Sequence, residues 1–335
     1  MNLAIQFCLE VFVMQKILIM GGSYFIGKSI AERLSQETEV MLLNRGSRSA
    51  PRDAKLLVCD RNNAQQMKEV LRGHYFDYII DVSGVSASQA DILVNSLEDR
   101  SSLKMLVFIS SSAVYDVENL HIPFKESDEL APNKYWTDYG TDKIAAENTY
   151  RAAFADTAVK TVFLRPPYVY GENNYAQRES FIFDHLINDR PIIIPKSNPL
   201  LQFIYARDLA DIISDMLGRC ETMPQNSVYN VGNSMGISCR EWVKACGQAA
   251  GVEPQIIEYD YEADGWQIRD FFPFFDYDNV LEVSAVKAMC PNETPFVEGL
   301  RNAFEWFKQN RDNIEFKPHV AQNEIDILKK LNKFE

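Results

Sequence analysis

A tyrosine and a lysine near the middle of the chain have the spacing of an acid/base pair. Tyr139 and Lys143 are separated by three residues, so on a helix they lie one turn apart on the same face. A nearby ammonium favours the phenolate, which predicts that the pKa of Tyr139 falls below its usual value of about 10. Such a phenol suits the oxidation of an alcohol, because it takes the hydroxyl proton while hydride leaves the carbon for a nicotinamide.

A serine-rich strand end supplies a second hydroxyl for the same substrate oxygen. Residues 104–109 form an apolar run of strand length and lead into Ser110-Ser111-Ser112. A tyrosine four residues before a lysine is common by chance, and a surface helix pair is the alternative interpretation. The order along the chain, with a glycine turn, then a serine-tipped strand, then this pair, favours the catalytic interpretation.

A strand, a tight turn and a helix near the start of the chain must position these groups. Residues 16–20 are apolar, residues 21–27 read Gly-Gly-Ser-Tyr-Phe-Ile-Gly, and the helical stripe consists of Ile26, Ile30 and Leu34. Gly21 can take backbone angles closed to other residues, and Gly27 allows helix and strand to pack closely. The exposed helix N-terminus attracts a pyrophosphate, and a purely structural turn is the alternative.

Apolar runs of strand length alternate with helical stretches along the first half of the chain. After residues 16–20, strands are expected at residues 39–43, 55–59, 78–82, 104–109 and 161–164. This alternation predicts an α/β fold with a doubly wound, Rossmann-type parallel sheet. Ligands of such sheets bind beyond the carboxyl ends of the strands. The polar residues expected at these ends include Asn44, Arg45, Asp60, Arg61 and Ser83.

The regular alternation ends near residue 168, which predicts two parts. The dinucleotide-binding domain is expected to comprise residues 14–167, with 202–217 and 226–232 added. A smaller, C-terminal substrate-binding part is expected to comprise residues 168–201 and 233–310. Its aromatic run, residues 266–277, is interpreted as core or as a domain contact, and a wall for a sugar-like ring is the alternative.

The two ends of the chain are expected to lie outside these parts. Residues 311–335 predict a helical tail with Ile325, Leu328 and Leu331 on one apolar face. Residues 1–13 are interpreted as a leader, because Met14 stands just before the first expected strand.

The residues after the second expected strand bear on the choice of dinucleotide. An acidic residue here accepts a hydrogen bond from the adenine ribose of NAD, whereas an arginine accommodates the 2′-phosphate of NADP. The chain has no acid at this point and carries Asn44, Arg45 and Arg48 instead. NADP is therefore favoured over NAD, and an arginine merely solvated at a strand end is the alternative.

Composition and charge argue against several classes of protein. The 335 residues are 46% hydrophobic and 24% charged, as in ordinary globular proteins, and the formal charge of -13 argues against a general nucleic-acid binder. The six cysteines include no Cys-x-x-Cys pair and the four histidines are isolated. We therefore expect no metal site, no disulfide framework and a reducing cytoplasm. No stretch has membrane length.

Taken in order, these motifs resemble the extended short-chain dehydrogenase/reductase superfamily, in particular its NAD(P)-dependent epimerase/dehydratase proteins. The resemblance covers residues 16 to about 308. It rests on the turn 21–27, Ser110-Ser111-Ser112-Ala113-Val114-Tyr115, Tyr139 with Lys143, Arg165-Pro166-Pro167-Tyr168-Val169-Tyr170-Gly171, Phe203-Ile204-Tyr205-Ala206-Arg207-Asp208-Leu209-Ala210, and Tyr229-Asn230-Val231-Gly232.

This resemblance implies roles for individual residues. Tyr139 would be the acid/base and Lys143 would hold the nicotinamide ribose. The family's serine or threonine falls on Ser111, with Ser112 as the alternative. Asp60-Arg61 would lie near the adenine and Pro166 near the nicotinamide. The residues expected to bind the cofactor are Gly21, Ser23, Tyr24, Phe25, Ile26, Gly27, Asn44, Arg45, Asp60, Arg61, Ser83, Tyr139, Lys143 and Pro166.

The chain departs from the family pattern at four places. Tyr24 replaces the middle glycine of the turn, which is similar to the branch containing the chloroplast stem-loop-binding proteins. Ser112-Ala113 replaces the Asp-Glu pair of sugar 4,6-dehydratases, which disfavours that dehydration. Leu201 and Tyr168 replace an arginine and an asparagine that commonly help hold the sugar-nucleotide diphosphate. The residues expected at the substrate are Ser112, Tyr168, Arg178 and Arg269. Lys196 is a further substitute for the missing arginine, and ordinary surface charge is the alternative for all three cations.

The expected function is that of a cytoplasmic NAD(P)-dependent sugar or nucleotide-sugar epimerase. A hydroxyl would be oxidised transiently to a ketone and reduced again on the other face. An NADPH-dependent reductase or dehydrogenase of a small carbonyl substrate is one alternative, and a non-catalytic nucleotide- or RNA-binding protein is another. We expect a small sugar-like substrate, no nucleic-acid partner and no membrane, and a family-like homodimer through the helices around Tyr139.

Overall fold

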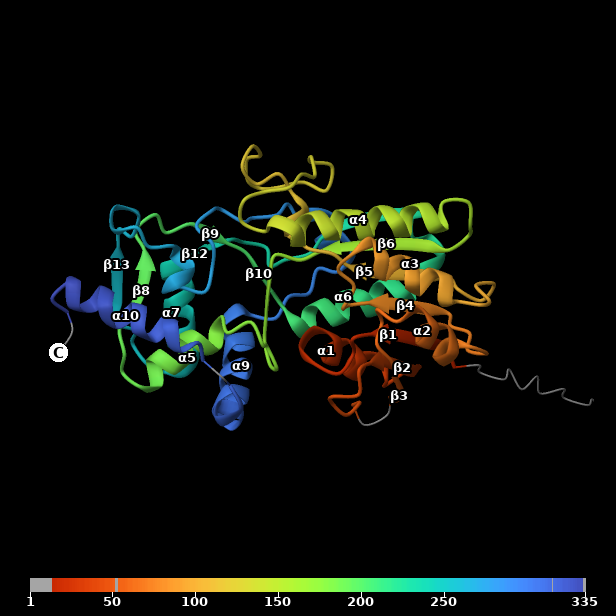
Figure 1. The fold of residues 1–335 in the computed structure, drawn as a ribbon, viewed down its shortest axis with the longest axis horizontal. Coiled ribbons are helices and arrows are strands. Elements are labelled where there is room, and N and C mark those ends of the chain that lie inside the picture. Colours follow the sequence, from red (N-terminus) through yellow and green to blue (C-terminus); the bar gives the residue numbers. More distant parts are fainter. Residues whose placement is uncertain (1–13, 52–53, 315, 334–335) are drawn as a thin grey trace, which may run out of the picture.

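The computed structural model describes residues 14–51, 54–314 and 316–333, so the predicted leader lies outside the described residues. Within these ranges, seven parallel strands form a central sheet in the order β11-β6-β5-β4-β1-β2-β3 (Figure 1). Its strands are β1 (Lys16–Met20), β2 (Glu39–Asn44), β3 (Lys55–Val58), β4 (Tyr78–Asp81), β5 (Met105–Ile109), β6 (Lys160–Arg165) and β11 (Asn226–Asn230). The predicted α/β fold with a doubly wound parallel sheet is confirmed.

Helices cover both faces of this sheet. On one face α1 (Phe25–Leu34) packs against α6 (Ala206–Gly218). On the other, α3 (Ala87–Ser96) packs between α2 (Ala64–Leu71) and α4 (Thr137–Phe154). The central strands β1, β4 and β5 are buried on both faces, which explains why β1 and β5 read as continuous apolar runs. Because all strands are parallel, their carboxyl ends meet at one edge of the sheet, and the polar strand ends meet there.

A second part lies beside the sheet domain and pairs its strands two by two (Figure 1). β7 (Tyr168–Tyr170) pairs with β10 (Phe203–Tyr205), β8 (Ile192–Pro195) with β13 (Ile256–Tyr259), and β9 (Leu200–Leu201) with β12 (Ile237–Ser238).

The remaining helices are α5 (Glu179–Ile187), α7 (Cys239–Ala250), α8 (Ser284–Met289), α9 (Phe296–Asn310) and α10 (Pro318–Lys330). The short 3-10 helices are η1 (Ser112–Val114), η2 (Cys220–Thr222), η3 (Glu262–Asp264), η4 (Ile268–Asp270) and η5 (Arg311–Asn313). None of the helices in the described ranges has the length and apolar content needed to cross a bilayer.

Aromatic rings hold the second part together. The rings of Phe203 and Trp242 stack with their centroids 4.1 Å apart, and Phe274 meets Trp242 edge-on at 5.6 Å. Phe271, Phe272 and Phe274 are buried in this core. The interpretation of residues 266–277 as core is therefore confirmed for these three rings.

The C-terminal tail is helical, as predicted, but its buried face differs from the predicted one. Ile327 and Leu328 are buried, whereas Ile325 and Leu331 are only half-buried. The unexpected member of this face is Glu324, which is buried because a carboxylate oxygen lies 2.8 Å from Nε2 of His185. A buried histidine partner outweighs the apolar spacing in setting how α10 docks.

Candidate active site

The glycine turn joins β1 to α1 with almost no space to spare. Gly21 has a φ of 89°, and a Cβ atom there would lie 2.6 Å from Cβ of Ser83. A Cβ atom on Gly27 would lie 2.2 Å from the carbonyl oxygen of Gly21, so only glycine lets α1 start this close to β1. Tyr24 is the N-cap residue of α1 and provides no side-chain cap. The first backbone N–H groups of α1 thus remain suited to an anion.

A pocket of about 340 Å³ lies beside this turn, at the carboxyl ends of the strands. Of the residues predicted to bind a cofactor, those that line it are Gly21, Ser23, Tyr24, Asn44, Arg45, Asp60, Arg61 and Ser83. Two buried donors in its wall, Nδ2 of Asn44 and Nε of Arg61, have no hydrogen-bond partner among the described residues. A dinucleotide carries acceptors that such donors can pair with, so the residues present fit a nicotinamide dinucleotide.

Arg61 is fixed in the pocket wall by a buried carboxylate. Its guanidinium donates to Oδ1 and Oδ2 of Asp81 at 2.7 and 2.9 Å, and to Oγ of Ser83 at 2.8 Å. Asp81 is completely buried at the end of β4 and also accepts from the hydroxyl of Tyr150 at 2.6 Å. Burial alone would raise the pKa of Asp81, but the Arg61 guanidinium beside it holds that pKa below its usual value.

Helix α4 carries Tyr139 and Lys143 to the end of β5, on the shared face that their spacing predicts. The helix comes close to η1 because residue 140 is glycine: a Cβ atom there would lie 2.4 Å from the carbonyl oxygen of Ala113. Ser111 caps η1 by accepting from the Ala113 N–H at 3.1 Å, and its hydroxyl also pairs with that of Tyr139. Ser111, Tyr139 and Lys143 therefore lie together at one end of the sheet.

Pro166 and Ser112 lie behind this group of three. The carbonyl of Pro166, which follows β6, accepts from the Ser112 N–H at 2.9 Å. Ser112 is almost completely buried, with 2% of its surface exposed. The pair thus supports the serine loop from the β6 side.

Lys143 is buried and links the loop after β4 to the last residue of β5 through backbone carbonyls. Its ammonium donates to the carbonyl oxygens of Gly84 and Ile109, both at 2.6 Å. Burial lowers the pKa of Lys143 to about 8, and the negative charge of Asp81 opposes that change. The lysine is therefore mostly charged at neutral pH and loses its proton slightly above it.

The predicted direction of the Tyr139 pKa is wrong. Desolvation of the hydroxyl raises its pKa, even though 38% of the residue's surface is exposed, and the hydrogen bond with Ser111 only partly offsets this. Lys143 does not counter it, because its ammonium is turned to the two carbonyls and lies 5.9 Å from the centroid of the Tyr139 ring. The phenol carries its proton at neutral pH.

Sequence reasoning missed the residues that anchor α4 to the sheet. Glu147 accepts from Nε and Nη2 of Arg165 at 3.0 and 2.7 Å and from the hydroxyl of Ser110 at 2.6 Å, all in buried surroundings. Tyr150 reaches Asp81. Glu147 and Tyr150 follow Lys143 by four and seven residues, so they lie on the same face of α4. This spacing is the sequence pattern from which their contact with the sheet could have been predicted.

Two of the residues expected at the substrate, Arg178 and Arg269, lie against aromatic rings of the second part. Cζ of Arg178 lies 4.8 Å from the ring centroid of Tyr168, and Cζ of Arg269 lies 5.2 Å from that of Phe275. Neither forms an ion pair within the described ranges, whereas Lys196 pairs with Asp260 at 3.1 Å. Burial and the charge of Arg178 lower the pKa of Arg269. Tyr168 itself is covered, with 1% of its surface exposed.

A tyrosine of the second part meets the glycine turn. The Tyr175 ring stacks on Tyr24 with centroids 6.1 Å apart and meets Phe25 edge-on at 6.0 Å. The guanidinium carbon of Arg48 lies 3.7 Å from the centroid of the Tyr24 ring. Tyr24, which replaces the middle glycine of the turn, is therefore packed against Tyr175 and Arg48.

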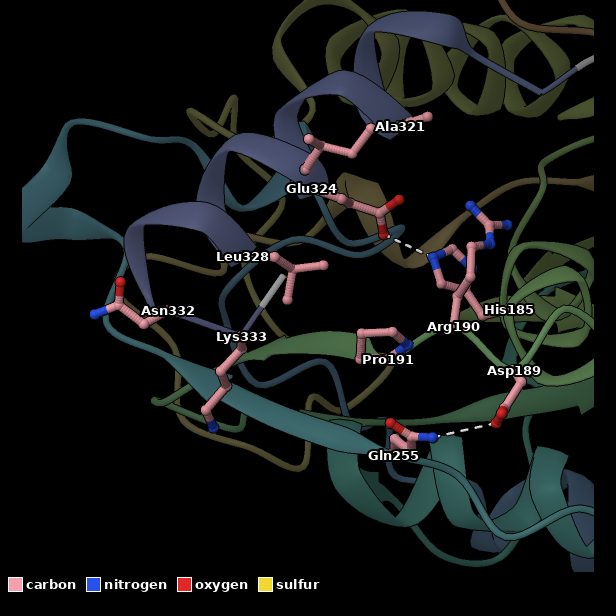
Figure 2. A pocket seen from close by; sticks show the side chains of 11 residues that line it. His185, Asp189, Arg190, Pro191, Gln255, Ala321, Glu324, Leu328, Asn332 and Lys333 are labelled. Carbon is pink, nitrogen blue, oxygen red and sulfur yellow. Dashed lines mark hydrogen bonds and ion pairs between the residues drawn. The ribbon is translucent and has the colours of Figure 1, made fainter. Parts of the chain in front are cut away.

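Another pocket, of about 590 Å³, lies in the second part between α5, β8 and α10 (Figure 2). His185 and Glu324 meet on its wall, and Asp189 accepts from Gln255 at 3.2 Å across its floor. None of the predicted site residues lines it. Among the residues that the structure describes, no group of three or more His, Cys, Asp and Glu side chains is arranged to hold a metal ion.

Two curated relatives match most of this chain. The 41 kDa chloroplast stem-loop binding protein b of Arabidopsis thaliana is 27% identical over 333 residues, which cover 93% of this chain and 82% of the relative. The UDP-glucose 4-epimerase of Halalkalibacterium halodurans is 24% identical over 277 residues, which cover 70% of this chain and 80% of the relative.

Solved structures share the fold. UDP-glucose 4-epimerase from Thermotoga maritima, solved with UDP-glucose, has a TM-score of 0.72 at 17% identity and covers 88% of this chain and 99% of its own. The Bordetella bronchiseptica enzyme WbmH, in complex with NAD+, has a TM-score of 0.71 at 15% identity, with the same coverage. Residues 17–232 match the profile of the NAD dependent epimerase/dehydratase family, more than half of the chain. The chain belongs to that family.

Proposed function

We propose that this protein is an NAD(P)-dependent epimerase that oxidises a hydroxyl of a sugar or nucleotide sugar to a ketone and reduces it again on the other face. The observation that carries the proposal is the grouping of Ser111, Tyr139 and Lys143 at the sheet edge that also bears the glycine-turn pocket. The names of the relatives, which include UDP-glucose 4-epimerases, support it.

Each group has a role in this proposal. The N-terminal turn of α1 binds the pyrophosphate, Asn44 and Arg61 pair with acceptors of the adenosine half, and Lys143 donates to the nicotinamide ribose. A bound nicotinamide supplies the acceptor and the donor of hydride. Ser111 donates a hydrogen bond to the substrate oxygen, and Tyr139 exchanges the proton of that oxygen.

The two half-reactions, reduction of the ketone and oxidation of the hydroxyl, require Tyr139 in opposite protonation states. As a protonated phenol at neutral pH, Tyr139 is ready to donate its proton to the ketone oxygen during reduction. Taking the hydroxyl proton during oxidation requires the phenolate, whose fraction increases with pH. We therefore expect oxidation to be the slower half-reaction at neutral pH and to speed up as pH rises.

The test is the interconversion of UDP-glucose and UDP-galactose, followed by nuclear magnetic resonance with the nicotinamide absorbance recorded in parallel. An epimerase interconverts the two sugars without a net change in that absorbance. Tyr139→Phe is expected to lose about a hundredfold or more of the rate and to retain NADH binding. Full activity in Tyr139→Phe would remove Tyr139 from the mechanism.

The cofactor side of the proposal favours NADP. Arg45 and Arg48 line the pocket after β2, and neither forms an ion pair in the described part of the chain. A 2′-phosphate would neutralise them. We expect tighter binding of NADPH than of NADH, with the difference reduced in Arg45→Gln. Equal affinities in the wild-type protein would contradict this choice.

A reductase that releases its cofactor is the second candidate, and the same two arginines favour it. Consumption of NADPH in proportion to a reduced product would identify it, because an epimerase returns its hydride to the substrate. Arg178 and Arg269 serve either candidate as cations that hold an anionic group of the substrate. Loss of substrate affinity in Arg178→Gln, but not in the control Arg301→Gln on the exposed face of α9, is the expected result.

A role in RNA binding rests on the 27% identity to the chloroplast stem-loop binding protein. The formal charge of -13 argues against it. Retention of RNA that weakens with salt and survives Tyr139→Phe would support this role. We also propose a homodimer through the helices around Tyr139, which light scattering would test.

A further inference from the structure

A single carboxylate touches both the cofactor pocket and the helix that carries Tyr139 and Lys143. Asp81 has none of its surface exposed and sits at the end of β4. Its two oxygens accept from the guanidinium of Arg61 on the pocket side. One oxygen also accepts from the hydroxyl of Tyr150, which belongs to α4. Asp81 is thus the point at which the wall of the pocket meets the acid/base helix.

The backbone of Gly84 extends this contact to Lys143. The Gly84 N–H donates to Oδ1 of Asp81 at 2.8 Å, and its carbonyl accepts from the Lys143 ammonium at 2.6 Å. Residue 84 is glycine because a Cβ atom there would lie 2.2 Å from Oδ2 of Asp81. The backbone of this one residue therefore joins the carboxylate to the ammonium, and its position depends on both.

Arg61 is the residue through which a ligand in the pocket can contact Asp81 and its hydrogen-bond partners. Its Nη1 and Nη2 are occupied by Asp81 and Ser83, but its buried Nε has no partner among the described residues. An unpaired buried donor is costly, and a ligand in the pocket that brings an acceptor would remove that cost. Arg61 also lines the pocket of about 340 Å³.

We propose that Asp81 is a positioning residue that couples the dinucleotide pocket to Lys143, by fixing Arg61 on one side and the backbone of Gly84 and α4 on the other. The inference rests on the proposed function, because it takes the ligand of the pocket to be a nicotinamide dinucleotide. Removal of the Asp81 charge changes cofactor binding and the protonation of Lys143 together. No other carboxylate in the described part of the chain contacts both Arg61 and α4.

The charges around Lys143 predict shifts of its pKa in opposite directions in two variants, which general damage to the fold would not produce. The ammonium faces Asp81 on β4, Arg61 from the segment after β3, and Glu147 and Tyr139 on its own helix. Asp81 and Glu147 raise the pKa of Lys143, and Arg61 lowers it. Asp81→Asn is therefore expected to lower the pKa of Lys143, and Arg61→Gln to raise it.

The experiment measures that pKa directly, by nuclear magnetic resonance on protein labelled with carbon-13 at the lysine Cε. The Lys143 signal is the one missing from Lys143→Arg. Asp77→Asn is the matched control, because Asp77 stands at the other end of the same strand and pairs with Lys104 at 3.0 Å. We expect opposite shifts in Asp81→Asn and Arg61→Gln and none in Asp77→Asn.

Cofactor binding is measured on the same proteins by NADH and NADPH fluorescence. Arg61→Gln and Asp81→Asn are each expected to weaken binding about tenfold. If Asp81→Asn does not fold, the double variant Asp81→Asn/Arg61→Gln replaces it, because it leaves no unpaired buried charge. The double variant is expected to give a Lys143 pKa below that of Arg61→Gln and slightly below that of wild type, because the effect of Asp81 is larger than the opposing effect of Arg61. Its cofactor binding is expected to be weak.

The outcomes separate this inference from the proposed function. Wild-type protein that binds neither NADH nor NADPH would contradict the proposed function, and the coupling would fall with it. Wild-type protein that binds the cofactor, together with variants whose Lys143 pKa does not move or moves in one direction only, would overturn the coupling alone.

Discussion

At the residue scale, burial moves the two ionisable groups of the site in opposite directions. It raises the pKa of Tyr139 and lowers that of Lys143 to about 8. The two shifts have one cause, because desolvation always disfavours the charged form. The neutral forms of both side chains are therefore favoured more than they would be in water. Small changes in their surroundings then decide which of the two carries charge.

Lys143→Met tests the burial of this lysine through protein stability. An unfolded lysine keeps its proton up to a pKa near 10.5, whereas Lys143 in the folded protein loses it from about 8. Between these values the unfolded state binds more protons, so the contribution of this group to stability increases with pH by roughly 3 kcal/mol. The free energy of unfolding in urea, wild type minus Lys143→Met, should therefore be larger at pH 10 than at pH 7.

A surface lysine serves as the control for this measurement. Lys68 is exposed on α2, so Lys68→Met is expected to give the same difference at both pH values. An equal difference for Lys143→Met would show that its ammonium is not desolvated in solution.

At the element scale, α4 determines the geometry of the site. Gly140 lets the helix touch η1, and Glu147 and Tyr150 fix it to the ends of β4, β5 and β6. These buried hydrogen bonds lie along one face of the helix and fix its position on the sheet. The distance between Tyr139 and Ser111 follows from these attachments.

Gly140→Ala tests this dependence. The added Cβ atom would lie 2.4 Å from the carbonyl oxygen of Ala113, so α4 has to move away from the serine loop. We expect a loss of about 1–3 kcal/mol in the free energy of unfolding and a clear fall in turnover, with NADH binding largely retained.

The matched substitution is Gly218→Ala in the last turn of α6. A Cβ atom there meets nothing within 4 Å, so stability should stay equal or increase slightly. Equal behaviour of the two variants would mean that α4 and η1 are farther apart than described.

At the scale of the whole molecule, two cores meet at the site. Trp136, just before α4, packs against both of them and donates from Nε1 to the hydroxyl of Tyr277 at 2.7 Å. The second core is closed at its far end by α10, where Glu324 pairs with buried His185 (Figure 2). The tail is thus a structural part of the second core.

Glu324→Ala is expected to destabilise the protein by about 3 kcal/mol, because it leaves His185 buried without this partner. Glu305→Ala, which removes an exposed pair with Lys308 at 2.9 Å, is expected to cost about 0.5 kcal/mol or less. Thermal unfolding would compare the two. NADH affinity should be unchanged in both, and similar melting temperatures would contradict the burial of Glu324.

The strands of the parallel sheet and the position of the glycine turn followed from local patterns in the sequence. Apolar runs such as residues 16–20 and 104–109 have the composition of doubly buried strands, and the polar residues after them could only gather at one edge. The Asp81–Arg61 pair could not be predicted, because it joins two strand ends whose spacing depends on the whole sheet. The Tyr139 pKa was misjudged because helical spacing places Lys143 nearby but does not show that its ammonium turns to Gly84 and Ile109.

The contact of Tyr175 with Tyr24 and Phe25 joins the second part to the glycine turn through aromatic rings. Aromatic contacts of this kind contribute about 0.5–1.5 kcal/mol and, unlike exposed ion pairs, are hardly screened by salt. Concentrated salt should therefore leave this contact between the two parts almost as strong as dilute buffer does.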